Sequence, residues 1–196
     1  GRLVKKYSII YGDPPWEYNV WKKKGKGRPA ASHYLTLSLE SLKKLNVPQI
    51  CAADCVLFLW VTFPNLREGL ELAGSWGFRY KTVAFVWVKT NPKSGGLFVG
   101  LGHYTRANAE MVLLFTKGKA LERKAKDVRQ VIMEPRSRHS QKPDAVRERI
   151  TKLFGALPRV ELFARDRPDA GHGEIFKGWD VFGFEVKNSI EIESKI

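Results

Sequence analysis

The stretch IIYGDPPWEY, residues 9–18, places an acidic residue, two prolines and a tryptophan directly after a run of apolar residues. That run, YSIIY (7–11), has the composition and length of a buried strand. Proline fixes φ, lacks an N–H and holds the residue before it in an extended conformation. The sequence therefore predicts a stiff segment that leaves the strand and holds Asp13 in one position.

Two interpretations of this segment remain open from the residues alone. In the first, the carboxylate of Asp13 and the carbonyl of Pro14, which has no local helix donor, form a fixed pair of acceptors beside the flat ring of Trp16. Two acceptors against a ring suit a planar group with an exocyclic NH2, such as a base that has left its stack. In the second, the segment is a proline turn capped by a core tryptophan.

Strands and helices alternate along the rest of the chain. Apolar runs bounded by turn-forming residues predict buried strands over 55–61, 82–89, 109–116 and 159–164. Helix patterns occupy 38–50, 65–77 and 142–155. The first has Ser38 as a candidate cap, and the last has a stripe of Val146, Ile150, Leu153 and Phe154 that ends at Gly155. This order predicts an α/β three-layer sandwich with a mostly parallel sheet that is covered on both faces.

The 196 residues suit a single domain, with a core over about 7–184 and a peripheral strand or tail over 185–196. Ligands of such sheets bind beyond the carboxyl ends of the strands. DPPW falls there, and so do the polar segments 89–108 and 165–179. The glycines of GGLFVGLG form neither a dinucleotide fingerprint nor a P-loop.

The charge of the chain points to a polyanion as partner. Its 34 Lys and Arg against 20 Asp and Glu give a net charge of +14. Basic residues cluster in KKKGKGRP (22–29), KGKALERKAKDVR (117–129) and RSRHSQK (136–142). Such clusters favour nucleic acid, because neutralised phosphates release counterions. The alternatives are a solvated basic surface and, less favoured without an amphipathic helix, a membrane surface.

Several classes of protein fit poorly. The longest apolar runs are much shorter than the about 20 residues that cross a bilayer, and no leader precedes the first strand, so we expect a cytoplasmic protein. Cys51 and Cys55 have the spacing of neither a zinc site nor a disulfide framework and are predicted to be buried thiols. The four histidines are scattered, and no metal site is predicted.

DPPW after a hydrophobic strand is similar to motif IV of amino-methyltransferases, and its tryptophan form resembles the MT-A70 family of adenine-N6 methyltransferases. The resemblance runs from about Tyr7 to about Gly183. Its further segments follow in the family's order: SHYLTLSLESL (32–42), FLWVT (58–62), VWVKT (86–90), SQKPD (140–144), VELFAR (160–165) and GWDVFG (178–183). It implies a Rossmann-like fold in a permuted order, with the catalytic strand before the cofactor strand, and S-adenosylmethionine as the cofactor.

The resemblance also implies roles for individual residues. Asp13, Pro14, Pro15 and Trp16 would hold the adenine amino group, with Asp13 also at the cofactor. The implied cofactor contacts are Lys89, Phe163, Arg165 and Asp180, the last in a GWD where eukaryotic relatives carry amides. The implied substrate contacts are Trp21, Lys22, Lys23, Lys24, Arg28, Tyr34, His103 and Lys142, the last as a contact to cofactor or phosphate. Only GRLVKK precedes the first strand, where eukaryotic relatives have cofactor contacts, so the pocket for the cofactor's adenine must be completed elsewhere.

Structural alternatives exist for several of these residues. Lys89 could be an ordinary lysine at a strand end, and Arg165 could pair on the surface with Asp166 or Asp169. A further alternative is that aromatic residues of the polar segments are half-buried packing residues; these are Trp21, Tyr34 and Tyr104.

The chemistry agrees with the resemblance. An adenine amino group is a weak nucleophile because its lone pair is delocalised into the ring. Acceptors at Asp13 and Pro14 would draw its N–H bonds out of conjugation and stabilise the developing positive charge. The short single-domain form favours DNA as substrate, by analogy with bacterial and phage enzymes. RNA is the nearest alternative, a catalytically silent nucleic-acid-binding partner is another, and a second copy of the chain is a candidate partner.

Overall fold

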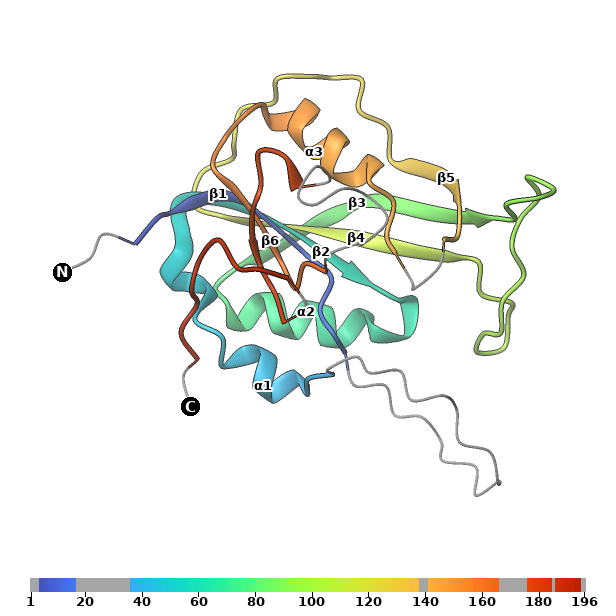
Figure 1. The fold of residues 1–196 in the computed structure, drawn as a ribbon, viewed down its shortest axis with the longest axis horizontal. Coiled ribbons are helices and arrows are strands. Elements are labelled where there is room, and N and C mark those ends of the chain that lie inside the picture. The colour runs from blue at the N-terminus through green and yellow to red at the C-terminus, as the bar shows by residue number, and fades with distance from the viewer. Residues whose placement is uncertain (1–3, 17–35, 138–140, 166–175, 185, 195–196) are drawn as a thin grey trace.

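The computed structural model describes residues 4–16, 36–137, 141–165, 176–184 and 186–194. Its centre is a seven-stranded sheet in the order β5-β3-β4-β2-β1-β6-β7 (Figure 1). The strands are β1 (Tyr7–Gly12), β2 (Cys51–Val61), β3 (Arg79–Thr90), β4 (Ala109–Lys117), β5 (Val131–Pro135), β6 (Arg159–Leu162) and β7 (Asp180–Phe182). The helices are α1 (Leu39–Lys43), α2 (Leu66–Ser75) and α3 (Ala145–Phe154), with 3-10 turns η1 (Val47–Ile50) and η2 (Phe63–Asn65).

The sheet is mostly parallel. β1 pairs in parallel with β2 and β6, β6 pairs in parallel with β7, and β3 pairs in parallel with β5. Only β4, among the described strands, runs against its neighbours β2 and β3. Its first residues therefore lie at the edge where the other strands end. This is a Rossmann-like, mostly parallel α/β sheet, so the predicted fold class is confirmed.

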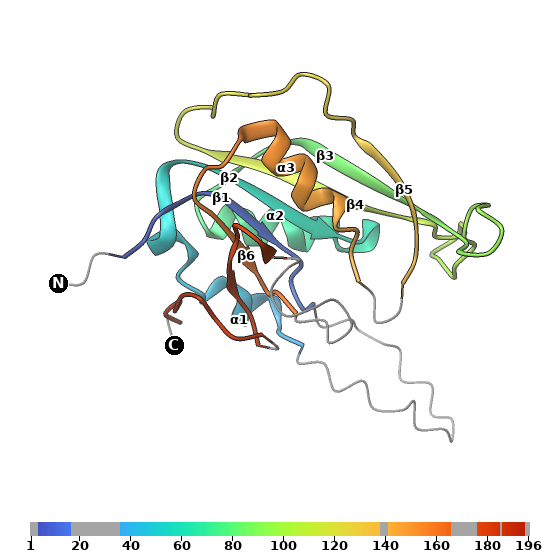
Figure 2. The same ribbon diagram turned by 45° about the horizontal axis from the view of Figure 1, so that its top comes forward.

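Helices cover both faces of the sheet (Figures 1 and 2). Leu42 of α1 and Leu72 of α2 belong to one buried cluster, together with β-strand residues such as Leu57. Val146 and Ile150 of α3 belong to a second cluster on the other face. Complete burial of one such side chain contributes about 1.5–3 kcal/mol. Because helices cover both faces of the sheet, the strands carry continuous apolar runs, as the sequence predicts.

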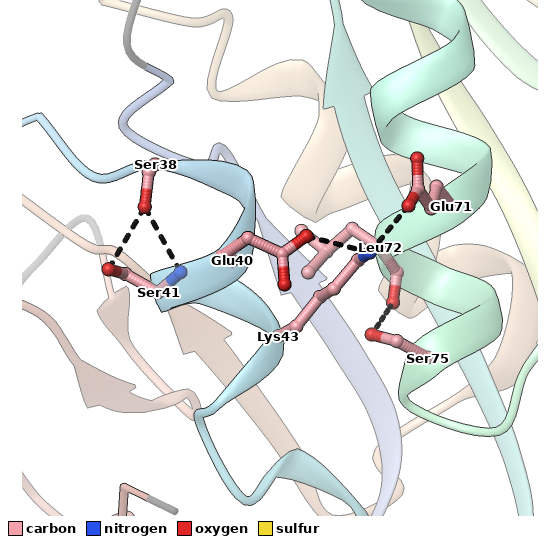
Figure 3. Close-up of polar contacts among 7 residues, drawn as sticks. All are labelled: Ser38, Glu40, Ser41, Lys43, Glu71, Leu72 and Ser75. Carbon is pink, nitrogen blue, oxygen red and sulfur yellow. Dashed lines mark hydrogen bonds and ion pairs between the residues drawn. The ribbon is translucent and has the colours of Figure 1, made fainter. Parts of the chain in front are cut away.

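The two helices on the first face are tied together by polar contacts (Figure 3). Ser38 caps α1, since its Oγ accepts a hydrogen bond from Ser41 N at 3.2 Å. Lys43, in the last turn of α1, forms ion pairs with Glu40 and with Glu71 of α2. The helix predicted over 38–50 is in fact α1 followed by η1, and Pro48 lies in the first turn of η1.

The start of β2 is irregular. Tyr7 of β1 lies opposite Cys51, but Ile9 lies opposite Val56, so β2 contains additional residues between these two pairs. Asp54, within this irregular stretch, accepts a hydrogen bond from Lys119 N at 2.8 Å. Cys51 and Cys55 flank it as buried free thiols, as predicted.

The C-terminal stretch packs beside α1 and η1. Asn46 N donates a hydrogen bond to Glu193 O at 2.7 Å, and Leu45 forms a β-bridge with Ser194. Ile192 is buried in the cluster on the same face. None of the helices in the described ranges is long and apolar enough to span a membrane.

Candidate active site

The segment after β1 is fixed by backbone hydrogen bonds. Trp16 N donates to Pro14 O at 2.9 Å, which closes a three-residue turn around Pro15. Pro15 O accepts a hydrogen bond from Leu37 N at 2.8 Å. Pro14 and Trp16 are buried, whereas the side chain of Asp13 is 31% exposed. The chain therefore holds Asp13 rigidly at the carboxyl edge of the sheet.

One expectation about this segment is wrong in detail. The Pro14 carbonyl does have a local donor, because the turn around Pro15 brings the N–H of Trp16 to it. A carbonyl oxygen has two lone pairs, so one remains for a ligand. The Trp16 ring is 5% exposed and lies in the buried cluster with α1 and α2. Trp16 is thus a core tryptophan, while Asp13 lies among charged groups.

Asp13 begins a row of alternating charges. Lys142 Nζ lies 3.6 Å from Asp13 Oδ2 and 3.1 Å from Glu110 Oε1. Lys89 Nζ lies 2.8 Å from Glu110 Oε2. The four residues come from the end of β1, the segment before α3, the start of β4 and the end of β3. Segments far apart in the sequence therefore converge at one point of the sheet edge.

Aromatic rings support the two lysines. Lys142 Nζ lies 5.6 Å from the centre of the Trp60 ring, and Lys89 Nζ lies 5.2 Å from that of Trp87. Both indoles are held by hydrogen bonds, from Trp60 Nε1 to Tyr11 Oη at 2.6 Å and from Trp87 Nε1 to Glu134 O at 2.9 Å. The ammonium groups are thus placed by rigid neighbours.

The two carboxylates of this row differ in their proton affinity. Burial raises the pKa of Asp13; Lys142 and Arg165 oppose the rise, and the negative charge of Glu110 adds to it. Burial also acts to raise the pKa of Glu110, but Lys142 and Lys89 outweigh it and the pKa is lowered. Glu110, between two lysines, therefore favours its ionised form. Asp13 is the carboxylate that is more readily protonated.

A buried ion pair positions the segment that carries Lys142. Arg147 of α3 contacts Glu161 of β6 at 2.6 Å and Asp144 at 2.9 Å. Burial raises the pKa of Glu161 to about 7, against the attraction of Arg147. Because Asp144 lies two residues after Lys142, this pair fixes the start of α3 against β6 and keeps Lys142 beside β1.

Phe163 and Arg165 follow β6, next to the end of β1. Phe163 has φ of 59°, which is uncommon for a residue with a side chain and occurs often at functional sites. Its ring stacks on Phe184, with the two centres 6.5 Å apart. Arg165 is near enough to Asp13 to lower its pKa. Both residues thus lie at the same edge as the charged row.

The structure does not bring every predicted residue to this edge. Asp180, the first residue of β7, accepts a hydrogen bond from Tyr7 Oη at 2.6 Å and forms an ion pair with Lys5 at 2.6 Å. His103 is exposed on the connection between β3 and β4. Six predicted substrate contacts lie outside the described residues: Trp21, Lys22, Lys23, Lys24, Arg28 and Tyr34.

Glu110 was not among the residues predicted from the sequence. It is the second residue of β4 and is buried, with a side chain 11% exposed. A lone acidic residue in the apolar run AEMVLLFT is the signal that could have found it, because buried charges need partners. Within the ranges described, no three His, Cys, Asp or Glu side chains gather as metal ligands.

The mostly parallel sheet carries Asp-Pro-Pro-Trp after one strand and a row of charges at the same edge, as the resemblance of the sequence to a family of S-adenosylmethionine-dependent methyltransferases implies. Residues 7–185 match the MT-A70 family, and the chain belongs to this family. MT-A70 methyltransferases use S-adenosylmethionine as methyl donor. The resemblance noted in the sequence is thereby confirmed.

Several proteins of known name are similar to this chain. Type II methyltransferase M.MunI of a Mycoplasma species is 42% identical over 97% of this chain and 83% of its own length. The METTL3 catalytic subunit of human N(6)-adenosine-methyltransferase is 29% identical over 83% of this chain. A probable MT-A70-like N(6)-adenosine-methyltransferase of rice is 28% identical over 83% of this chain. The chain spans 26% of the human protein and 21% of the rice protein.

Proposed function

We propose that this protein transfers a methyl group from S-adenosylmethionine to N6 of adenine in DNA. The similarity to M.MunI supports DNA, because it extends over 83% of that protein and the name type II methyltransferase points to DNA. The animal and plant relatives are named N(6)-adenosine-methyltransferases, which supports N6 of adenine as the acceptor.

The observation that carries the proposal is the position of Asp13. Its carboxylate is held at the sheet edge, partly exposed, 3.6 Å from Lys142 at the end of the charged row. An ionised carboxylate there accepts one N–H of an exocyclic amino group, and the second lone pair of Pro14 O accepts the other. Both bonds reduce the delocalisation of the amino nitrogen and stabilise the positive charge that develops on it.

The donor set fits the cofactor. The amino-acid part of S-adenosylmethionine carries one ammonium and one carboxylate, and the charged row offers both partners. Lys89 and Lys142 would hold the carboxylate, and Asp13 would hold the ammonium. Phe163 and Arg165 would complete the site at the end of β6. When bound, the cofactor supplies a methyl group on a positively charged sulfur.

The remaining substrate contacts belong to the same proposal. Trp16 and Pro15 keep the acceptor pair rigid through their backbone hydrogen bonds. The basic run over 22–29 and Trp21 would meet phosphates and bases, Tyr34 would contact the adenine, and His103 would lie near the DNA. We expect the enzyme in the cytoplasm, and a second copy could help to grip a duplex.

Methyl transfer from labelled S-adenosylmethionine tests the proposal. Duplex DNA, single-stranded DNA and RNA of matched sequence are compared, and the product nucleoside is identified by mass spectrometry. We expect N6-methyladenine in DNA. Preferential methylation of RNA would overturn the assignment of substrate, and DNA binding without calorimetric affinity for the cofactor would indicate a silent partner subunit.

A further inference from the structure

Residues 91–108 connect β3 to β4 and project beyond the sheet edge that carries the charged row (Figure 1, green, at the right). We call this segment the β3–β4 projection. Lys89 N donates a hydrogen bond to Asn108 O at 2.8 Å, and Lys89 O accepts one from Phe98 N at 2.9 Å. Both parts of the projection are thus fastened to the backbone of a residue in the charged row.

The β3–β4 projection has a folded backbone of its own. Asn91 N donates to Gly96 O at 2.8 Å, and Gly100 N donates to Ala107 O at 3.0 Å. A Cβ at Gly100 would lie 2.6 Å from Ala107 O, and one at Gly102 would lie 2.0 Å from Thr105 O. The close approach of the two sides therefore depends on glycine, and the projection presents its tip in a defined geometry.

Tyr104 stands at a strained turn of this segment. Thr105 N donates to His103 O at 2.7 Å, and Tyr104 between them has φ of 65°. A three-residue turn with positive φ at its central residue is rare and strained. The Tyr104 ring is fully exposed, which rules out the alternative that it is a half-buried packing residue. Burial of the ring therefore does not compensate for the backbone strain at Tyr104. Strained backbone of this kind is typical of residues that contact a ligand.

The surroundings of Tyr104 are apolar and basic. Leu101 is 87% exposed, and Val99 and Leu97 are exposed as well. Residues 91–108 contain Lys93 and Arg106 and no acidic residue. Beside them, the Arg136 guanidinium lies 3.7 Å from the centre of the Phe98 ring. An exposed aromatic ring with apolar neighbours suits stacking on a base, and the surrounding positive charges suit contact with phosphates.

A second copy of this chain suits the surface less well. The β3–β4 projection carries Lys93 and Arg106 and no acidic residue, so this surface offers no opposite charge to a second copy of a chain whose net charge is +14. The charge argument therefore favours a polyanion over self-association.

We propose that the β3–β4 projection is a second nucleic-acid contact, in which Tyr104 stacks on a base that flanks the target adenine. Lys93 and Arg106 lie along the phosphates of the same strand. This inference rests on the proposed function, because it takes DNA as the substrate. It adds a stacking residue at a distance from Asp13 and makes the connection between β3 and β4 part of the DNA-binding surface.

Binding of a fluorescein-labelled duplex, measured by anisotropy at fixed salt, tests the role of Tyr104. We expect Tyr104→Ala to weaken binding about tenfold, since loss of one stacked base typically costs about 5- to 150-fold in affinity. Tyr104→Phe should retain the affinity, because stacking needs the ring and not the hydroxyl. Tyr80→Ala is the matched control, since Tyr80 is half-exposed near the opposite end of β3.

Photocrosslinking shows the contact directly. Duplexes with 5-iodouracil at positions flanking the adenine are irradiated with the protein, and the linked peptide is identified by mass spectrometry. We expect the peptide that contains Tyr104. Unchanged affinity of Tyr104→Ala, with crosslinks only elsewhere, would overturn the inference.

Two further measurements distinguish this inference from self-association and from the proposed function. Sedimentation equilibrium compares the masses of the wild type and Tyr104→Ala; a dimer that the substitution converts to a monomer would assign the surface to self-association and overturn the inference. Methyl transfer is assayed on the same duplex. Weakened binding without any methylation would refute the proposed function alone, and full methylation with unchanged binding would refute the stacking role alone.

Discussion

Lys142 Nζ lies 3.6 Å from Oδ2 of Asp13, so the segment that leads into α3 meets the segment that leaves β1. The two residues are separated by most of the chain, and only the parallel packing of β1 and β6 with α3 brings them together. Lys142 also lies 3.1 Å from Glu110 and thereby connects Asp13 with β4. The charge state of Asp13 is consequently set by groups from several elements.

Replacement of Asp13 should separate activity from stability. Asp13→Asn removes the negative charge and should lower turnover by about 100- to 1,000-fold, the usual loss for one group that stabilises a transition state. Since burial raises the pKa of Asp13, its charged form opposes folding, and the variant should melt no lower than the wild type at pH 8. Methyl transfer and circular-dichroism melting measure the two effects.

Asp13→Ala is the companion variant, expected to fold and to be inactive. Activity close to that of the wild type in either variant would remove Asp13 from the mechanism.

Replacement of Glu110 should move the pH profile. The negative charge of Glu110 contributes to the raised pKa of Asp13, so Glu110→Gln should lower that pKa. If Asp13 acts as a carboxylate, the acidic limb of kcat/KM against pH moves to lower pH. Turnover at the optimum should also fall, by up to about 100-fold, because Lys89 and Lys142 lose their shared partner. An acidic limb that stays in place or moves to higher pH would contradict the coupling.

Glu161 should make the stability of the protein depend on pH. Its pKa is about 7 in the folded protein against an ordinary value of 4.5, so the folded state retains a proton that the unfolded state loses. The free energy of unfolding should therefore fall by about 1 kcal/mol per pH unit between pH 4.5 and 7 and level off above. Glu161→Gln should abolish this slope in urea denaturation.

The surface residue Glu122 supplies the control for this experiment, because its side chain is 80% exposed. Glu122→Gln should retain the slope of the wild type. Identical slopes in wild type and Glu161→Gln would assign the pH dependence to other groups.

Two glycines of α2 should respond in opposite ways to the same substitution. A Cβ at Gly69 would lie 2.4 Å from Val61 Cγ1 of β2, so Gly69→Ala forces α2 away from the sheet and should cost about 1–3 kcal/mol. A Cβ at Gly74 meets no atom within 4 Å, and Gly74→Ala should stabilise the helix by about 0.5–1 kcal/mol. Urea denaturation of both variants tests the packing of α2, which equal effects would contradict.

Long apolar patterns made most of the fold predictable. Five strands and the helix stripe of Val146, Ile150 and Phe154 follow from continuous or periodic burial. β5 and β7 were missed because they are short, at five and three residues, and lie at the two sides of the sheet. The helix over 38–50 was predicted too long because α1 ends at Lys43 and a separate turn, η1, begins at Val47 with Pro48 as its second residue.

The positions of candidate residues at this sheet edge were predictable where a residue lies at the end of a parallel strand or within three residues after it. Asp13 and Arg165 follow β1 and β6, and Lys89 lies at the end of β3. Glu110 escaped this rule because β4 runs in the opposite direction and places its first residues at that edge. The hydrogen bond to Pro14 O and the exposure of Tyr104 depend on turn geometry, which the residue types leave open.

The hydrogen bonds of Lys89 to Phe98 and Asn108 and the bridge between Thr90 and Leu97 hold the base of the β3–β4 projection, so the pairing of β3 with β4 does not depend on the length of residues 99–107. We expect residues 99–107 to tolerate segments of other lengths and compositions, because the hydrogen bonds of Lys89 to Phe98 and Asn108 lie outside this range. A change confined to residues 99–107 should thus leave the charged row in place. For protein engineering, this connection is a place to graft or randomise residues in a search for new target sequences.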